Sequence, residues 1–578
     1  MAAPPAETTL LQDRLFAGLS RMFAREAPLY GRSLEVNAVV NRAACDLLSL
    51  LFRGFSVTDA QLARTGGERH GAIRIGRPDE FRWVARYFGA FGMEPHNFYD
   101  MTAIGSRSQP VIATAFRSVL RPEHRVFTSL LMTDYFDPDT RARIERLLAR
   151  RQVFTDRAKE LIEKSERQGG LDPSDGDALV REGIERIFAW TGQANDRRLF
   201  AELSDAGFRI AADIACSRTH HLNHLTPNTL LMDLYTASMK HCLGELDGPS
   251  FRRSAARALE RLAAQADRDW LRLHFRHLGQ AELDSFLPRT ASAADVAALA
   301  EGLESTFGEA RFRLSVLPNS GFKDFTEGPS QDTPVFLRQD AYRAVTEPVE
   351  FTEEDGSTIA APYTARFGEV EQRFYACTPA GRTLYDRCLA DAETVRERDP
   401  GLPTRDRDAY ERAYSAAFAP FPKSLLELVA KGLVFARFAP TPAGESAASR
   451  GALPATDLVQ LARAGMVTCE GLRYEDFLPV SAAGIFASNL SQYGTASTAA
   501  VRPTYSKQRL EEIMGKRIVE AGEVYAGIDA ASRLDTWAAL GILERVPDAE
   551  RAFFEAAVAA CPAQVLREAR DLGAAVVV

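Results

Sequence analysis

The sequence contains few of the residues that build disulfides, zinc ribbons and redox motifs. Its 578 residues include only seven cysteines, an odd number spread widely along the chain, and no Cys-x-x-Cys pair occurs. We therefore expect reduced thiols, most of them packed as small apolar side chains in a cytoplasmic protein.

Several signatures of common enzyme families are also missing. The chain has no Gly-x-x-x-x-Gly-Lys-Ser/Thr loop, no Gly-x-Gly-x-x-Gly turn, no Gly-x-Ser-x-Gly elbow and no His-Glu-x-x-His helix. These absences remove the usual support for ATP binding, dinucleotide binding and the α/β-hydrolase reaction. Only nine histidines are present, so the surroundings of each can be inspected.

Charge and hydropathy exclude two further classes of partner. The 70 Lys and Arg residues are outnumbered by 78 Asp and Glu, which gives a net charge of -8 and no general positive field for nucleic acid. The longest apolar runs are far shorter than the roughly 20 residues that cross a bilayer. The first residues show no basic segment followed by an apolar one, so neither membrane insertion nor export is expected.

Hydrophobic periodicity indicates an α+β fold. Helical spacing of apolar residues predicts helices over 9–26, 34–52 and 78–91. A glycine-bracketed strand is predicted over 66–76, and further strands are predicted over the following ranges: 111–116, 124–130, 310–316, 334–338, 365–377 and 432–438.

The chain is expected to form one large catalytic unit over residues 1–578. Its β core is predicted from four segments, 66–130, 208–228, 310–440 and 465–490. A charged helical insertion is expected over 230–306, a loop over 440–455 and a helical C-terminal region over 505–578.

The first candidate site is a strand bracketed by glycines. In an extended strand, His70 and Arg74 share one face, whereas Ile73 and Ile75 point to the opposite face. Their Cα atoms would be about 13 Å apart, and because the long arginine side chain can lean back toward the histidine, the interval could hold a short diacid. The alternative is an edge histidine and a solvated arginine.

The second candidate is a cluster of three histidines, His220, His221 and His224. In a helix, His220 and His224 would be one turn apart and could chelate a metal, with zinc as the first choice. The sequence Thr226-Pro227 disfavours a helix directly after His224, so we prefer a loop or short strand in which one histidine is a ligand. A polar run without a metal is equally compatible with the pattern.

The third candidate is a predicted strand in which Glu369, Glu371 and Arg373 share one face. If these three side chains are buried, each needs a partner. One glutamate could bind a metal while the other pairs with Arg373, although an exposed salt-bridged strand is the commoner use of this pattern. Two histidines and one carboxylate would form the facial set that leaves positions open on ferrous iron.

Taken together, several motifs resemble the 2-oxoadipate dioxygenase/decarboxylases, also called D-2-hydroxyglutarate synthases. The similar segments occur in family order and cover most of the chain outside the predicted insertion. They are Pro28 to Gly31, Arg69 to Gly76, Phe98 to Asp100, Arg125 to Leu130, Asn223 to Pro227, Val335 to Gln339, Phe367 to Arg373, Thr378 to Asp386 and Phe477 to Leu490.

The resemblance implies a vicinal-oxygen-chelate-like central β-sheet or barrel surrounded by helices. It also implies Fe(II) bound by His70, His224 and one glutamate, for which we choose Glu371 with Glu369 as the alternative. Arg74 is then expected to bind the distal carboxylate of the substrate. Two further residues, Val480 and Ser481, are expected to contact the substrate from another side.

The implied reaction converts 2-oxoadipate and O2 into D-2-hydroxyglutarate and CO2, with no flavin or nicotinamide. The chain departs from the family pattern at Phe374, where glycine is usual, at Asn228, where arginine is frequent, and in its long helical block. The rival hypotheses are a non-oxidative metal-dependent isomerase or hydrolase on the same scaffold and a carboxylate-binding protein without turnover.

Overall fold

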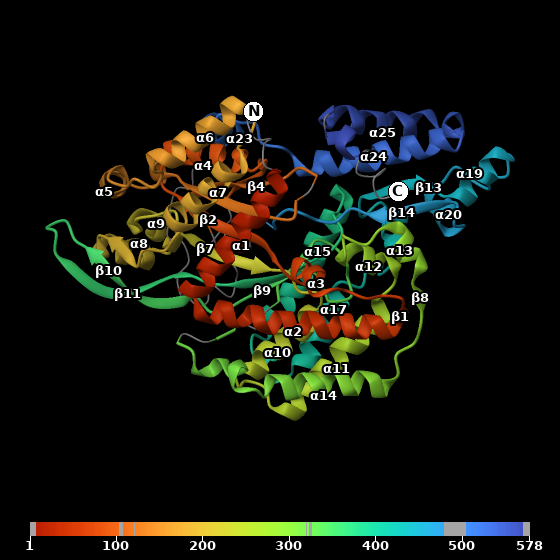
Figure 1. Ribbon diagram of the computed structural model, residues 1–578, viewed down its shortest axis with the longest axis horizontal. Helices are drawn as coiled ribbons and strands as arrows, with labels where there is room; N and C mark the ends of the chain where they lie inside the picture. The colour runs from red at the N-terminus through yellow and green to blue at the C-terminus, as the bar shows by residue number, and fades with distance from the viewer. Residues whose placement is uncertain are drawn as a thin grey trace.

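The structure is a computed structural model that describes residues 7–102, 108–120, 122–318, 321–322, 326–478, 504–563 and 565–569. Helices and several small sheets are intermixed along the chain (Figure 1). The α+β class predicted from the sequence is therefore confirmed.

The largest sheet has five strands in the order β3-β4-β5-β2-β7. Its strands are β2 (Glu68–Ile75), β3 (Glu94–Asp100), β4 (Val111–Arg117), β5 (Arg125–Leu131) and β7 (Leu222–Pro227). Strand β2 pairs parallel with β5 and antiparallel with β7, and the remaining pairs are antiparallel. The strand expected between the glycines is thus flanked on both sides and lies inside the sheet.

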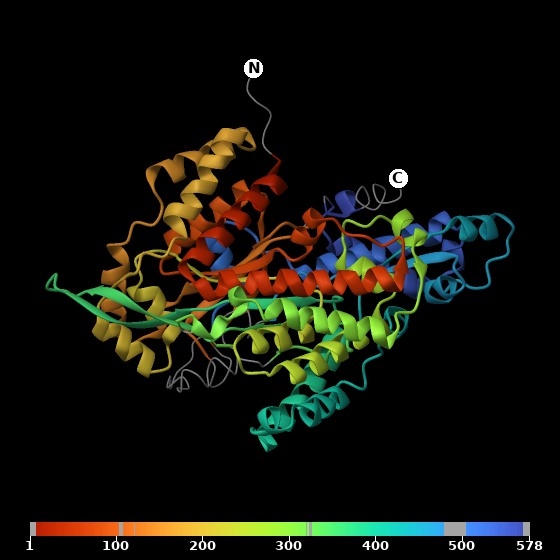
Figure 2. The same cartoon turned by 60° about the horizontal axis from the view of Figure 1, so that its bottom comes forward.

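Four smaller sheets complete the β structure. They contain β1 (Phe52–Arg53) with β8 (Leu287–Pro288), β9 (Leu337–Ala341) with β12 (Glu369–Arg373), β6 (Gln193–Asn195) with β10 (Val345–Thr352) and β11 (Thr358–Arg366), and β13 (Ala436–Pro440) with β14 (Val467–Gly471). The β10–β11 hairpin extends from one end of the molecule (Figures 1 and 2). Within the described residues no sheet closes on itself, so the barrel form of the expected core is not found there.

Helices surround these sheets. Those of the first half are α1 (Thr8–Glu26), α2 (Pro28–Leu51), α3 (Asp59–Thr65), α4 (Pro78–Ala90), α5 (Pro138–Ala149), α6 (Asp156–Gln168), α7 (Pro173–Glu182), α8 (Arg197–Asp205), α9 (Arg209–Cys216), α10 (Met232–Cys242), α11 (Gly248–Gln265), α12 (Arg268–His274) and α13 (Gln280–Ser285). Those of the second half are α14 (Ala293–Phe307), α15 (Pro379–Arg398), α16 (Leu402–Arg405), α17 (Arg407–Ala417), α18 (Leu425–Ala430), α19 (Pro442–Ser449), α20 (Leu458–Arg463), α23 (Lys507–Met514), α24 (Ala521–Ala539) and α25 (Asp548–Ala560). No helix of the described residues is both long and apolar enough to cross a bilayer.

The segment 232–307 is helical apart from β8 and its loops. Helix α2 packs against α10, α11 and α14 of this segment, and all four contribute to one hydrophobic core (Figure 1). Their apolar faces explain the helical periodicity read in the sequence. In the C-terminal part, α24 packs against α25 and against β13.

Two predicted elements are wrong. Residues 310–316, expected as a strand, form two 3-10 turns, Ala310–Phe312 and Leu314–Val316, in which Phe312 and Leu314 are buried. The expected loop over 440–455 contains helix α19, which begins with Thr441 as N-cap and Pro442 in its first turn. The three N-terminal helices predicted from apolar spacing are confirmed by α1, α2 and α4.

Candidate metal centre

Three strands from distant parts of the sequence meet at one buried site. In the antiparallel pairing of β2 with β7, His70 lies opposite Thr226 and Ala72 lies opposite His224. Strand β12 approaches the end of β7, where the backbone nitrogen of Thr229 donates to the carbonyl oxygen of Glu371 at 2.8 Å. The topology therefore brings the first, second and third candidate segments together.

His70, His224 and Glu369 form a group that could hold a metal ion. Each offers one ligand atom, and these atoms all lie within 4.8 Å of one another. The side chains of His70 and Glu369 are 1% exposed and that of His224 is fully buried. Two imidazoles and one carboxylate in a buried site form a donor set that binds divalent transition metals.

The two ring nitrogens of His70 have different partners. Nδ1 lies 2.7 Å from Oε2 of Glu371, whereas Nε2 lies 3.1 Å from Oε2 of Glu369 and faces the metal group. If Nδ1 carries the proton and donates it to Glu371, the lone pair on Nε2 is directed at the group. Glu371 thus fixes the tautomer and orientation that a ligating imidazole needs.

Glu371 itself is enclosed by cations. Arg373 donates to it through Nε at 2.5 Å and Nη2 at 2.9 Å, and Nη1 of Arg125 lies 3.5 Å from its Oε1. Burial alone would raise the pKa of Glu371, but the charges of Arg373 and His70 hold it well below its usual range. Glu371 is therefore an ionised acceptor whose two oxygens are already bound by donors.

Glu369 has more freedom. Its Oε2 accepts from the hydroxyl of Thr226 at 3.0 Å, whereas its buried Oε1 has no hydrogen-bond partner among the described residues. Burial raises the pKa of Glu369, and His224 and His70 outweigh that effect and lower it. An ionised carboxylate with one unsatisfied buried oxygen is the kind of group that a cation would complete.

Aromatic rings form the walls of the centre. His224 stacks on Phe367, with ring centroids 4.8 Å apart, and Phe477 meets the edge of His70 at 4.9 Å. Next to Phe367, Gly368 is closely covered, because an added Cβ would lie 2.6 Å from the ring of Tyr342 and 2.9 Å from that of Tyr30. These contacts restrict the position from which Glu369 reaches the group.

Comparisons with known proteins identify the family. A model of the 2-oxoadipate dioxygenase/decarboxylase family matches residues 15–258 and 272–489. The chain belongs to this family. Residues 259–271 are the part of the predicted insertion that falls between the two matched ranges.

Curated and solved relatives agree with the family assignment. The chain is 32% identical over 525 residues to the 2-oxoadipate dioxygenase/decarboxylase of Pseudomonas putida, which covers 89% of this chain and 94% of the relative. The Escherichia coli protein of the same name is 30% identical over 532 residues, 90% of this chain and 97% of its own. The crystal structure of the Pseudomonas putida hydroxyglutarate synthase in complex with 2-oxoadipate is similar with a TM-score of 0.64 at 30% identity, covering 93% of this chain and 100% of that one.

Arg74, the expected carboxylate-binding residue, lies further along β2. Ile73 and Ile75 pack in one hydrophobic core and Ala72 in another, so the predicted division of the strand into two faces is present. Arg74 donates through Nη1 to Oδ2 of Asp213 at 2.7 Å. Its guanidinium is thus anchored at one end by an acidic residue of α9.

The other expected contacts are placed as follows. Val480 and Ser481 lie outside the described residues. His220 lies beside Glu80, with Nε2 3.2 Å from Oε2, and His221 lies beside Asp213 at 3.4 Å. Neither belongs to the group formed by His224, which lies on a strand rather than on the chelating helix considered from the sequence.

Sequence reasoning missed three polar residues around the site. Thr226 was used only as a signal against a helix, although its hydroxyl contacts both His70 and Glu369. Arg125 lay in a segment similar to the family but was given no role. Asp213 stands in the otherwise apolar stretch from Ile210 to Cys216, and a single acid in such a stretch was a signal for a buried ion pair.

Neither of the two single-residue departures from the family pattern belongs to the metal group. Phe374 packs in the C-terminal core against the edge of His274, with ring centroids 5.9 Å apart. Asn228 is buried, donates to the carbonyl of Thr65 at 2.9 Å and accepts at its own carbonyl from Asn37. Both residues therefore contribute to the packing around the site.

Proposed function

We propose that this chain converts 2-oxoadipate and O2 into D-2-hydroxyglutarate and CO2, with Fe(II) held by His70, His224 and Glu369. The observation that carries the proposal is the buried group of two histidines and one glutamate in a chain of this family. The relative from Pseudomonas putida that has been crystallised with 2-oxoadipate supports the choice of substrate. Two histidines and one carboxylate are the ligand set of non-haem iron oxygenases.

Glu369 replaces Glu371, the first choice from the sequence, as the proposed ligand. Both oxygens of Glu371 accept from Arg373, and one also contacts Nδ1 of His70. Glu369 offers Oε2 within the group and a second oxygen without a partner among the described residues. The residues present therefore fit a divalent cation that Glu369 would bind, while Glu371 would hold the ligand His70 in place through its Nδ1.

Fe(II) held by His70, His224 and Glu369 would supply the Lewis acidity that attracts a 2-oxo acid and the one-electron chemistry that O2 requires. The surrounding side chains would orient the ligands and the substrate and keep water away from them. Glu371 keeps the proton on Nδ1 of His70, and the rings of Phe367 and Phe477 exclude water from the two imidazoles. Arg74 would bind the distal carboxylate in a planar bidentate geometry, with Val480 and Ser481 as further substrate contacts.

A vicinal-oxygen-chelate-like arrangement of the core is part of the proposal. The positions of the proposed ligands support it. His70 and His224 stand on the neighbouring strands β2 and β7. Glu369 stands on β12, which a parallel bridge between Glu371 and Asn228 joins to the residue directly after β7. Such a placement on strands holds the donors more rigidly than loops would.

Oxygen uptake together with CO2 release tests the proposal. With ferrous iron, 2-oxoadipate should consume O2 and release CO2 in equal amounts, and anaerobic samples should do neither. His224→Ala should lose iron and activity, whereas the control His220→Ala should retain iron because His220 lies against Glu80 instead. Turnover without O2 would support the isomerase or hydrolase hypothesis, and binding without turnover would support the carboxylate-binding protein.

A further inference from the structure

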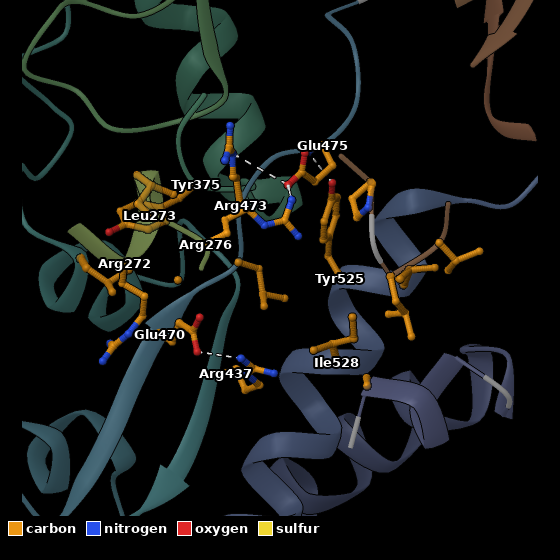
Figure 3. Close-up of a pocket in the computed structure, with 18 of the residues that line it drawn as sticks. Arg272, Leu273, Arg276, Tyr375, Arg437, Glu470, Arg473, Glu475, Tyr525 and Ile528 are labelled. Carbon is orange, nitrogen blue, oxygen red and sulfur yellow. Dashed lines mark hydrogen bonds and ion pairs between the residues drawn. The ribbon is translucent and has the colours of Figure 1, made fainter. Parts of the chain in front are cut away.

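A cavity of about 190 Å³ lies between α12, the β13–β14 pair and α24, away from the metal group. Figure 3 shows Glu475 at its upper end, the Arg437–Glu470 pair at its lower end, and Tyr525 and Ile528 on the side of α24. Part of the wall is apolar, formed by Leu273, Leu425, Leu472, Val524 and Ile528. Its size suits a small metabolite or an inorganic ion rather than a nucleotide.

Arg473 is a largely buried arginine of this cavity whose guanidinium has no hydrogen-bond partner among the described residues. Its side chain is only 10% exposed, and its buried Nε is unsatisfied. Within the described part of the chain its one ion pair is long, with Nε 3.8 Å from Oε1 of Glu475. A guanidinium has five N–H donors, so burying it without acceptors is costly unless a ligand supplies them.

The other arginines of the cavity have protein partners. Arg437 donates to Glu470 at 2.7 Å, and Arg276 pairs with Glu475 at 3.1 Å and with Glu123 at 3.2 Å. Glu475 also accepts from Arg125 at 2.5 Å. Five arginines line the cavity against three acidic residues, Asp269, Glu470 and Glu475, so positive charge exceeds negative charge along its wall.

The electrostatics of Arg473 agree with this geometry. Burial and the repulsion of Arg276 and Arg69 lower the pKa of Arg473 to about 10, against the attraction of Glu475. At neutral pH the group is still a cation. The cavity therefore presents a largely buried positive charge that makes no hydrogen bond among the described residues.

We propose that this cavity is a second ligand site, which binds the oxyanion of a small metabolite, a carboxylate or a phosphate group, through Arg473 and Arg276. The planar donor edge of an arginine matches both kinds of oxyanion. The apolar wall on the side of α24 would cover the carbon skeleton of an organic anion. This proposal concerns a site separate from the metal centre and does not depend on the reaction assigned above.

The site is separate from the metal centre but linked to it. Oε2 of Glu475 contacts Nη2 of Arg125, whose Nη1 lies 3.5 Å from Oε1 of Glu371. Glu371 in turn contacts His70. Two charged residues, Arg125 and Glu371, thus stand between Glu475 and His70.

Thermal unfolding with sulfate and with glutarate tests the site and separates tetrahedral from planar oxyanions. Either anion, at constant ionic strength against sodium chloride, should raise the Tm in a saturable manner, because a ligand of the folded state stabilises it. A response to sulfate alone would indicate a phosphate-type ligand, and a response to glutarate alone a carboxylate.

Arg473→Met should weaken the binding at least tenfold, as expected for the loss of charge-assisted hydrogen bonds. Without ligand this variant should unfold at the same or a higher temperature than the parent, because an unsatisfied buried cation has been removed. The matched control Arg405→Met, at an exposed arginine paired with Asp399, should keep the full response.

A second variant tests the site without removing an arginine, in case Arg473→Met fails to fold. Ile528→Glu keeps every arginine and places a carboxylate at the cavity wall, so it should abolish the response to added anions. The proposal is overturned if neither anion stabilises the parent beyond chloride, or if the Arg473→Met variant responds as the parent does.

Discussion

Nδ1 of His70 lies 2.7 Å from Oε2 of Glu371, while its other ring nitrogen faces Glu369 and His224. A carboxylate that holds the far side of a ligating imidazole fixes its tautomer and raises its basicity. We therefore expect the two glutamates of β12 to have different tasks, although they stand only two residues apart. This division leads to the first prediction.

Glu369→Ala should remove metal binding, whereas Glu371→Gln should retain the metal with about 10- to 100-fold lower affinity. The reason is that Glu369 is part of the group itself, and Glu371 acts through His70. Metal content after dialysis against a graded series of chelator concentrations measures both effects. Equal and complete loss in the two variants would contradict the division of tasks.

The sequence could not separate these glutamates because residues two apart in a strand face the same way. The pattern did predict that one glutamate would bind a metal and the other would pair with Arg373. What decides between them is Arg125 and the ring of His70, which come from other strands of the fold. Such long-range contacts are absent from local periodicity.

The same limit explains the wrong strand over 310–316. Alternate burial of Phe312 and Leu314 was correctly indicated, but a strand also needs a neighbouring edge with which to pair. Successive 3-10 turns bury the same two side chains without such an edge. By contrast, the start of α19 had a local signal, since Thr441 and Pro442 form an N-cap followed by proline.

Gly368→Ala should lower metal affinity without changing any ligand. An added Cβ would collide with the rings of Tyr342 and Tyr30, so the start of β12 and with it Glu369 must shift. We expect a loss of at least tenfold in metal affinity, comparable to other losses of ligand orientation. Gly432→Ala, at a position with open space around it but a positive φ, is a control for general destabilisation.

Metal titration of Gly368→Ala distinguishes the two effects. If its metal affinity equals that of the parent while its Tm falls, Gly368 serves packing alone and the inferred coupling to Glu369 is wrong.

His96 predicts a pH dependence of stability away from the metal centre. Burial and the charge of Arg117 lower the pKa of His96 to about 3, against the attraction of Asp476. In the unfolded chain the imidazole titrates near its usual value of about 6.5. Between about pH 6.5 and 3 the unfolded state therefore binds a proton at His96, whereas the folded state does not. Stability is therefore lost as the pH falls from about 6.5 toward 3.

The expected loss from this group is about 2 kcal/mol between pH 7.5 and pH 5. His96→Asn keeps an amide that can donate to the carbonyl of Glu94, as Nδ1 does at 2.7 Å, and it cannot titrate. Urea unfolding at both pH values should show a smaller decrease for this variant than for the parent. An unchanged decrease would show that His96 is protonated in the folded state.

The last prediction concerns Arg74 and its anchor Asp213. Arg74→Met should reduce kcat/KM for 2-oxoadipate at least tenfold more than for 2-oxohexanoate, which lacks the distal carboxylate. The iron content should stay unchanged, because Arg74 is not a member of the metal group. Equal proportional losses on both acids would mean that Arg74 has only a structural task.

Asp213 holds Arg74 at 2.7 Å and accepts from the hydroxyl of Tyr363, so it fixes the direction in which the guanidinium points. Asp213→Asn should therefore raise the KM for 2-oxoadipate more than it lowers kcat, while the KM for 2-oxohexanoate changes little. A matched control is Asp529→Asn, which loosens a comparable pair with Arg533 on α24. If both variants change the two substrates alike, the effect is on stability, and Asp213 does not position Arg74 for the distal carboxylate.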